Sequence, residues 1–179
     1  MRLLKTIKII AAVAVAVLSS SCADREAGRI MDTAENVMWT KPDSALAALE
    51  SIDTLTLKTK VQRARYSLLY TMALDRNHLS IKNIDFIRPA ATYYERHGSY
   101  DDKMKMYFYL GTAQYDNGDL ESAIASYLRA KEYSSKSENL VFKGIISYNV
   151  PQISDRRLSQ KKTITLQRNG KDNTKKVHP

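Results

Sequence analysis

The sequence predicts an all-α protein, and three observations carry this prediction. Leu, Ala, Met and Lys are plentiful, whereas the 179 residues include only four Pro and six Gly, a composition that favours helix. Between positions 25 and 150, apolar residues recur at helical spacing in one segment after another. Eleven Tyr stand against one Trp and three Phe, and a Tyr ring packs between helices while its hydroxyl stays in water. We expect about three helical hairpins and one further helix.

Residues 1–21 have the layout of an export signal. The first eight residues contain three cations and no acid, Ile9 to Leu18 is an unbroken run of ten apolar residues, and three serines follow. Ten apolar residues span about 15 Å as a helix, which is about half the hydrocarbon thickness of a bilayer. We therefore expect a signal helix at residues 1–21 and not a transmembrane helix.

Cys22 is the single cysteine, so the chain cannot form an intramolecular disulfide. The segment from Leu18 to Cys22 reads Leu-Ser-Ser-Ser-Cys and resembles a bacterial lipobox, although Ser19 stands where that pattern usually has Leu. The resemblance implies lipidation of the Cys22 thiol and cleavage just before it. It also implies a membrane-anchored lipoprotein of the cell envelope, on the periplasmic or outer-membrane side. The alternative is a secreted protein with an incidental free cysteine.

Two helices are expected in the first part of the helical region. Residues 25–39 carry apolar side chains on one side of a first helix. The segment from Thr40 to Asp43 interrupts this pattern, and residues 45–52 form the apolar face of a second, short helix. Pro42 suits the first turn of that helix, and Thr40 or Asp43 is expected to cap it.

Two longer helices follow, and a fifth begins near residue 100. Lys58 to Asp75 is predicted as the third helix and residues 79–96 as the fourth. Pro89 lies inside the fourth and predicts a kink or a late start. Gly98 lies just past its end and predicts a stop. The acidic pair Asp101-Asp102 is expected to open the fifth helix, because acids suit the positive end of the helix dipole.

Residues 104–136 are the most informative segment. They contain a large aromatic, a Leu-Gly pair, a polar turn and a small–aromatic–small series, at Tyr107, Leu110-Gly111, Asn117-Gly118-Asp119, and Ala123, Tyr127 and Ala130. This order resembles one tetratricopeptide repeat, a helix–turn–helix unit of about 34 residues. Gln114 and Ser135 depart from the family pattern. The resemblance implies that Gly111 and Ala123 let two antiparallel helices approach closely.

The resemblance extends less strictly to residues 22–153. The stretches PDSALAALESID, ARYSLLYTMALDRN and AATYYERHGSYDDKMKMYFYLG resemble a tetratricopeptide-like α-solenoid of envelope lipoproteins and membrane-tethered regulators. Residues 138–150 predict a further helix. Residues 154–179 are highly charged without sustained periodicity, so we expect a disordered basic tail. The abrupt loss of periodicity suggests a truncated or frameshifted product, and a genuine tail that binds anionic lipid or nucleic acid is the alternative.

The positive charge is concentrated at the two ends of the chain. The net charge is +9, of which residues 1–21 contribute +3 and residues 155–179 contribute +6, so the segment between them is neutral. A neutral body is a poor phosphate binder, and no nucleic-acid partner is expected for it. The three histidines, His78, His97 and His178, lack the spacing of a metal-binding pair, and no Gly-rich phosphate loop occurs. We therefore expect no enzyme activity and no cofactor.

The family resemblance implies a non-catalytic scaffold in which the first helix of each pair lines a groove for a protein or peptide partner. Mapped onto this sequence, the groove-facing positions are Lys105, Phe108, Thr112, Tyr115 and Asp116 in the matching repeat, and Ser67, Thr71 and Asp75 in the preceding pair. One alternative is the sensor part of a tetratricopeptide-containing signalling or transcription regulator. Another is an outer-membrane nutrient-binding lipoprotein, against which the single Trp39 argues.

Overall fold

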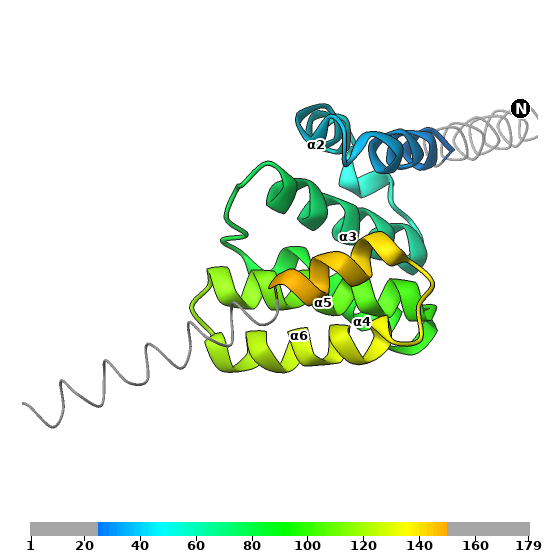
Figure 1. Cartoon of the computed structure of the whole chain (residues 1–179). Helices are drawn as coiled ribbons and strands as arrows, with labels where there is room; N and C mark the ends of the chain where they lie inside the picture. The colour runs from blue at the N-terminus through cyan, green and yellow to red at the C-terminus, as the bar shows by residue number, and fades with distance from the viewer. Residues whose placement is uncertain (1–24, 150–179) are drawn as a thin grey trace, which may run out of the picture. The chain divides into compact units, whose positions relative to one another are not determined.

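The computed structural model describes residues 25–149, and within this range every regular element is helical (Figure 1). The prediction of an all-α fold is therefore confirmed. The described residues form two compact units, one ending at Gly98 and the other beginning at Ser99. The predicted signal segment, Cys22 and the predicted tail at 154–179 lie outside the described residues. No helix within residues 25–149 is long and apolar enough to span a membrane.

The first unit contains four α-helices and two short 3-10 helices. In chain order these are the helix of residues 25–37, α2 (Pro42–Glu50), η1 (Thr54–Thr56), α3 (Lys60–Arg76), η2 (Ile84–Phe86) and α4 (Arg88–His97). The second unit contains α5 (Tyr100–Asp116), α6 (Leu120–Ser134) and the helix of residues 140–149. Each predicted helix is present, with ends that differ from the prediction by a few residues in most cases and by nine at the start of α4.

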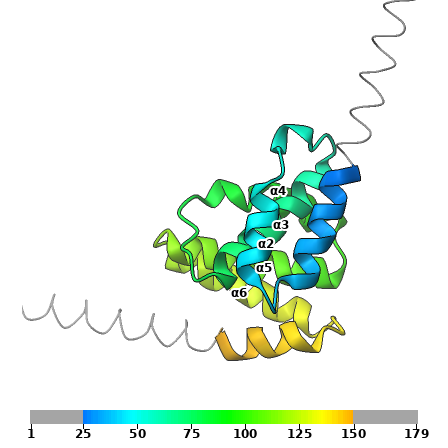
Figure 2. The same cartoon turned by 90° about the horizontal axis from the view of Figure 1, so that it is seen from above.

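A tight turn joins the helix of residues 25–37 to α2, and the two helices lie side by side (Figure 2). The predicted cap of α2 is wrong, because Lys41 is the N-cap residue and no side chain caps the helix. Pro42 occupies the first turn as predicted and has no N–H that would need a cap. Asp43 lies in the first turn, where its charge suits the helix dipole, and Thr40 precedes the cap.

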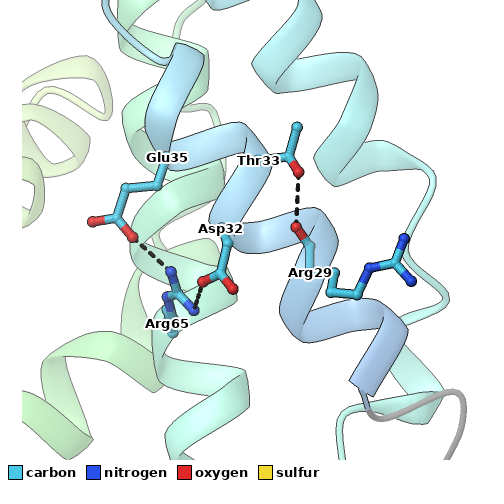
Figure 3. Close-up of polar contacts among 5 residues, drawn as sticks. All are labelled: Arg29, Asp32, Thr33, Glu35 and Arg65. Carbon is cyan, nitrogen blue, oxygen red and sulfur yellow. Dashed lines mark hydrogen bonds and ion pairs between the residues drawn. The ribbon is translucent and has the colours of Figure 1, made fainter.

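Arg65 connects α3 to the helix of residues 25–37 (Figure 3). Its two terminal nitrogens each lie 2.7 Å from a carboxylate oxygen, one of Asp32 and one of Glu35. Partial burial lowers the pKa of Arg65, but hydrogen bonds to Glu35 and Asp32 outweigh it and raise the pKa above its usual value. All three side chains are partly exposed, so this fork fixes the position of the helix more than it stabilises the fold.

The starts of α3 and α5 are built in the same way. Thr59 caps α3 and Ser99 caps α5, and each hydroxyl accepts a hydrogen bond from the backbone N–H three residues later. The side chain at that third position, Gln62 or Asp102, accepts from the backbone N–H of the cap residue. Both helices therefore begin with a capping box. The predicted role of Asp101-Asp102 in opening the fifth helix is confirmed, since both lie in its first turn.

The ends of α3 and α5 are equivalent as well. Asn77 and Asn117 follow the two helices, and each side-chain amide donates to the carbonyl four residues earlier at 2.7 Å. The next residues, His78 and Gly118, have φ values of 57° and 80°. This left-handed residue after a helix is a common C-terminal stop. The two helices therefore correspond position by position from their first residue to their last.

The structure of α5 and α6 confirms the helix–turn–helix expected for residues 104–136. The turn at Asn117-Gly118-Asp119 is present, and Asp119 caps α6 by accepting from the N–H of Ser122 at 3.1 Å. Gly111 lies against the ring of Tyr127, and a Cβ placed there would be 2.9 Å from two ring carbons. The predicted close approach of the two helices at Gly111 is therefore confirmed.

Side chains of α5 and α6 pair in antiparallel order. The hydroxyl of Tyr127 donates to that of Thr112 at 3.2 Å, and the ring of Tyr107 stacks on that of Tyr133 with centroids 5.7 Å apart. Arg129 donates to the hydroxyl of Tyr107 at 3.0 Å. Tyr residues thus fill the space between helices while their hydroxyls keep polar partners, as the composition predicts.

The fourth helix begins later than its apolar pattern suggests. α4 begins at Arg88 with Pro89 in its first turn, so the late start predicted from Pro89 is confirmed. α4 ends before Gly98 as expected, but Gly98 has φ −76° and not the left-handed conformation of a glycine stop. The reason is that Ser99 caps the next helix immediately, which requires an extended backbone at the junction.

The helix of residues 140–149 packs on α5. Phe142 and Ile146 are buried, and the ring of Phe142 makes edge contacts with Phe108 and Tyr109. Asn139 accepts from the N–H of Phe142 at 3.1 Å and so caps the first turn.

Candidate functional site

A hydrogen-bonded junction between α3 and the η2–α4 segment builds the candidate site in the first unit. The hydroxyl of Ser67 on α3 donates to the carbonyl of Phe86, at the end of η2. The same hydroxyl accepts from the N–H of Ala90 at 3.4 Å. Ser67 is buried, and it holds η2 and the start of α4 against the middle of α3. From this point α4 runs antiparallel to α3, with Arg63 and Tyr93 lining one common cavity.

This cavity has a volume of about 400 Å³ and a strongly basic lining. Its walls are Lys60 and Arg63 from α3, Asp85 from η2, and Arg88, Pro89, Thr92, Tyr93, Arg96 and His97 from α4. Four permanent cations therefore face one carboxylate. The region between residues 22 and 154 is neutral as a whole, so this is a local excess of positive charge on a neutral background.

The internal contacts of the lining leave most of this positive charge uncompensated. Asp85 already pairs with Arg88, with a nitrogen–oxygen distance of 2.5 Å. The guanidinium of Arg63 donates to the carbonyls of Leu57 and Lys58 at 2.8 and 2.9 Å. Carbonyls orient Arg63 but carry no net negative charge, so the lining keeps an excess of three positive charges that attracts anions.

A second cavity of about 400 Å³ adjoins the first and has an aromatic wall. The rings of Tyr66 and Tyr70 are stacked with centroids 5.6 Å apart, and Phe86 meets Tyr70 edge-on at 5.6 Å. Burial raises the pKa of both tyrosines, and the negative charge of Glu50 raises each further. A phenol is neutral at physiological pH even with its ordinary pKa of about 10, so both side chains are uncharged there.

The two cavities are neighbours that share part of their lining. Arg63, Asp85 and Pro89 line both of them. The combined surface, which we call the α3–α4 cleft, has a cationic half and an aromatic half. Phe86 is 43% exposed although it lies in a wall, so an apolar group that enters the cleft can bury part of its ring.

Three of the predicted groove residues are buried in the structure. Ser67 makes the α3–α4 junction described above, and the hydroxyl of Thr71 donates to the carbonyl of Ser67 at 2.8 Å inside α3. Phe108 packs against Tyr127 and Phe142. Thr71 and Phe108 are therefore not part of an accessible surface, whereas Ser67, although buried, lines the second cavity.

The other predicted groove residues are more accessible. Asp116 is exposed, and Asp75, Lys105, Thr112 and Tyr115 are half-buried. Lys105 extends over the ring of Phe142 at 5.8 Å, and Thr112 accepts from Tyr127. None of these five positions lines either of the two cavities described above.

Apart from Ser67, the residues of the α3–α4 cleft were missed by sequence reasoning, although their spacing held a signal. Arg88, Thr92 and Arg96 follow one another at intervals of four on α4, and Lys60 and Arg63 are three apart on α3. Each set marks one face of its helix. The sequence alone does not show that the two faces meet, because that depends on the Ser67 junction between distant segments.

Comparisons with known proteins do not indicate a function for this chain. No family model matches the chain, no curated protein matches it, and no solved structure matches it. Within residues 25–149, no group of three or more His, Cys, Asp or Glu side chains is arranged to hold a metal ion.

Proposed function

We propose that this chain is a non-catalytic helical scaffold that binds a protein or peptide partner at the bacterial cell envelope. The observation that carries the proposal is the α3–α4 cleft, whose lining combines cations with an aromatic wall. Such a lining is suited to recognition, because charged groups orient a ligand and apolar rings bury part of it.

A tetratricopeptide-like repeat architecture belongs to this proposal. It is supported by the equivalence of α3 and α5, which share their length and their start and end motifs. The repeat of that family is about 34 residues long, shorter than the interval from Lys60 to Tyr100. The connection of residues 77–87 between α3 and α4, which includes η2, accounts for the extra length. Repeats of this kind present one helix of each pair to a ligand.

The lipid anchor is the second part of the proposal and rests on the lipobox-like segment at Leu18 to Cys22. Metabolic labelling with an alkynyl fatty acid tests it in a bacterial host. We expect label in the wild-type chain and none in Cys22→Ala, which should also leave the membrane fraction. Equal labelling of both chains would contradict the anchor.

Site-specific photo-crosslinking in cells tests the scaffold function. A photoreactive amino acid replaces Thr92 in the cleft, Tyr115 on the predicted groove, or the exposed Ala125 on α6 as the control. We expect a discrete protein adduct from position 92 or 115 and none from position 125. Adducts from none of the three, or the same adducts from all three, would contradict a scaffold with a defined binding surface.

A further inference from the structure

We infer that the α3–α4 cleft binds an extended acidic peptide segment of the partner, with one aromatic or large aliphatic side chain seated between Tyr66, Tyr70 and Phe86. This inference rests on the proposed scaffold function and gives the chemistry of its ligand. Three properties of the cleft point to it: the charge of its lining, the chemistry of its second half, and its extent.

The charge of the lining favours an anionic ligand. Lys60, Arg88 and Arg96 are all exposed, and the only carboxylate of the lining is already paired with Arg88. An acidic segment brings carboxylates that form charge-assisted hydrogen bonds with guanidinium groups, often two at a time. A basic or neutral segment would leave the like charges of the lining facing one another.

The aromatic half of the cleft selects against a simple anion. Tyr66, Tyr70 and Phe86 form a wall of three contacting rings, and both phenols are neutral at physiological pH. A phosphate or a single carboxylate gains little from such a wall. A Phe, Tyr, Trp or Leu side chain gains buried apolar area and ring contacts there.

The extent of the cleft favours a peptide over a compact ligand. Each cavity has about 400 Å³, and the two lie next to each other, with Arg63, Asp85 and Pro89 in both linings. A ligand that fills both halves needs carboxylates and an apolar group held a short distance apart along one flexible chain. A peptide with acidic residues beside one aromatic residue has that arrangement.

Fluorescence anisotropy with a panel of labelled peptides tests the inference, using the full-length chain in mild detergent. The probe contains Glu and Asp around one Phe, and its comparators replace the Phe with Ala or the acids with Lys. We expect the acidic Phe peptide to bind best, with an affinity that falls as salt screens the charges. The Ala peptide should bind roughly tenfold more weakly, since it loses the burial of one aromatic side chain.

Two double variants separate the cleft from the rest of the charge. Lys60→Glu with Arg96→Glu reverses two cations of the cleft, and Arg29→Glu with Lys131→Glu makes the same change in net charge at exposed sites outside it. We expect the first pair of substitutions to weaken binding of the acidic probe by about tenfold or more. The second pair should weaken it by less than about twofold. Residues 155–179 carry +6 in every variant, so their attraction for the probe is constant.

Phe86→Ala tests whether the aromatic half of the cleft contacts the Phe side chain of the peptide. This substitution should lower the affinity for the acidic Phe peptide and leave the affinity for the acidic Ala peptide unchanged, because only the Phe peptide has a ring to bury. Circular dichroism confirms folding, and Lys60→Gln with Arg96→Gln replaces the charge reversal should that variant unfold.

Three results would overturn the inference: equal effects of the two charge reversals, equal binding of the Phe and Ala peptides, or full competition by inorganic phosphate or anionic vesicles. Adducts at position 92 would then still support the scaffold function, whereas loss of all adducts would end both.

Discussion

Single residues in this fold act through the space they leave or fill. Gly111 is the clearest case, because the ring of Tyr127 on α6 occupies the space where Gly111 of α5 has no side chain. Tyr127 cannot easily withdraw, since it is buried and its hydroxyl is bonded to Thr112. The glycine thus permits the packing of a tyrosine between helices, at the expense of helix propensity.

Gly111→Ala is expected to destabilise the second unit, whereas Gly144→Ala is not. An added Cβ at position 111 would meet the Tyr127 ring at 2.9 Å, and overpacking of this kind costs about 1–3 kcal/mol. At position 144, also in a helix, nothing lies within 4 Å, so the change gains up to about 1 kcal/mol of helix propensity. Urea unfolding followed by circular dichroism measures both. Equal stability of the two variants would show that α5 and α6 are not in close contact.

Asp119 gives the stability of α6 a defined dependence on pH. Hydrogen bonds from the side chain and the backbone N–H of Ser122 lower the pKa of Asp119 below its usual value. A lowered pKa in the folded state means that the stabilisation is complete above about pH 4, the pKa of an unfolded aspartate, and is lost as the pH falls through the folded value.

Asp119→Asn removes this titration while keeping a good cap. We expect the wild-type chain to be more stable than the variant at neutral pH and to lose this advantage below about pH 4. Urea unfolding over a pH series measures the difference. Asp119→Ala serves as the control, because it lacks a cap and should be less stable than Asp119→Asn at every pH. A wild-type advantage that persists in acid would contradict the assignment.

At the scale of elements, α3 and α5 are two versions of one design. Both are 17-residue helices that begin with a capping box and end with Asn followed by a residue of positive φ. They differ at the last position, where α3 has His78 and α5 has Gly118. A non-glycine residue in the left-handed region is strained by roughly 1–2 kcal/mol, so α3 ends less favourably than α5.

This difference predicts opposite effects at equivalent positions. His78→Gly should stabilise the first unit by roughly 0.5–1 kcal/mol, because relief of strain exceeds the added entropy of the unfolded chain. Gly118→Ala should destabilise the second unit by about 1 kcal/mol. Nothing lies within 4 Å of the Cβ that Gly118→Ala adds, so its effect comes from the backbone alone. Thermal unfolding measures both, and a destabilising His78→Gly would mean that the imidazole makes a contact worth more than the strain.

The elements that could be predicted from the sequence are those with local end signals. The turn at residues 117–119, the acids that open α5 and the late start at Pro89 are all encoded within a few neighbouring residues. The cap of α2 was predicted wrongly, because Pro42 in the first turn removed the need for a side-chain cap, whereas the stop at Gly98 is present without a left-handed backbone. A helix can begin or end with different local residues and backbone conformations, so the sequence does not always show which of them is used.

The α3–α4 cleft could not be predicted, because it depends on packing between distant segments. The family resemblance implied a groove position for Ser67, and Ser67 does line the second cavity, but its hydroxyl is bonded to Phe86, 19 residues away. That bond brings the cationic face of α4 to Lys60 and Arg63. The sequence shows only that the cations recur at helical spacing. A charged face on a helix is usually a solvent-exposed surface, so this spacing alone does not predict a binding site.

At the scale of the whole molecule, net charge and local charge have different roles. The region between residues 22 and 154 is neutral, while residues 155–179 carry +6. Nonspecific binding to nucleic acid grows with the number of cations that can contact phosphates along the duplex. The few cations of the α3–α4 cleft form a local site on α3, η2 and α4, whereas the eight Lys and Arg of residues 155–179 are spread along a continuous segment.

Any affinity for DNA is therefore expected to come from residues 155–179 and not from the cleft. Anisotropy of a short labelled duplex over a salt series measures it for three chains: the wild type, a variant with the eight Lys and Arg of residues 155–179 changed to Gln, and Lys60→Glu with Arg96→Glu. We expect steep salt dependence in the first and third and almost none in the second, since released counterions set the slope. If the variant with the Gln changes still bound DNA with the wild-type salt dependence, the cleft or another face of the helical body would bind phosphates. Nucleic acid would then be an alternative ligand to the acidic peptide.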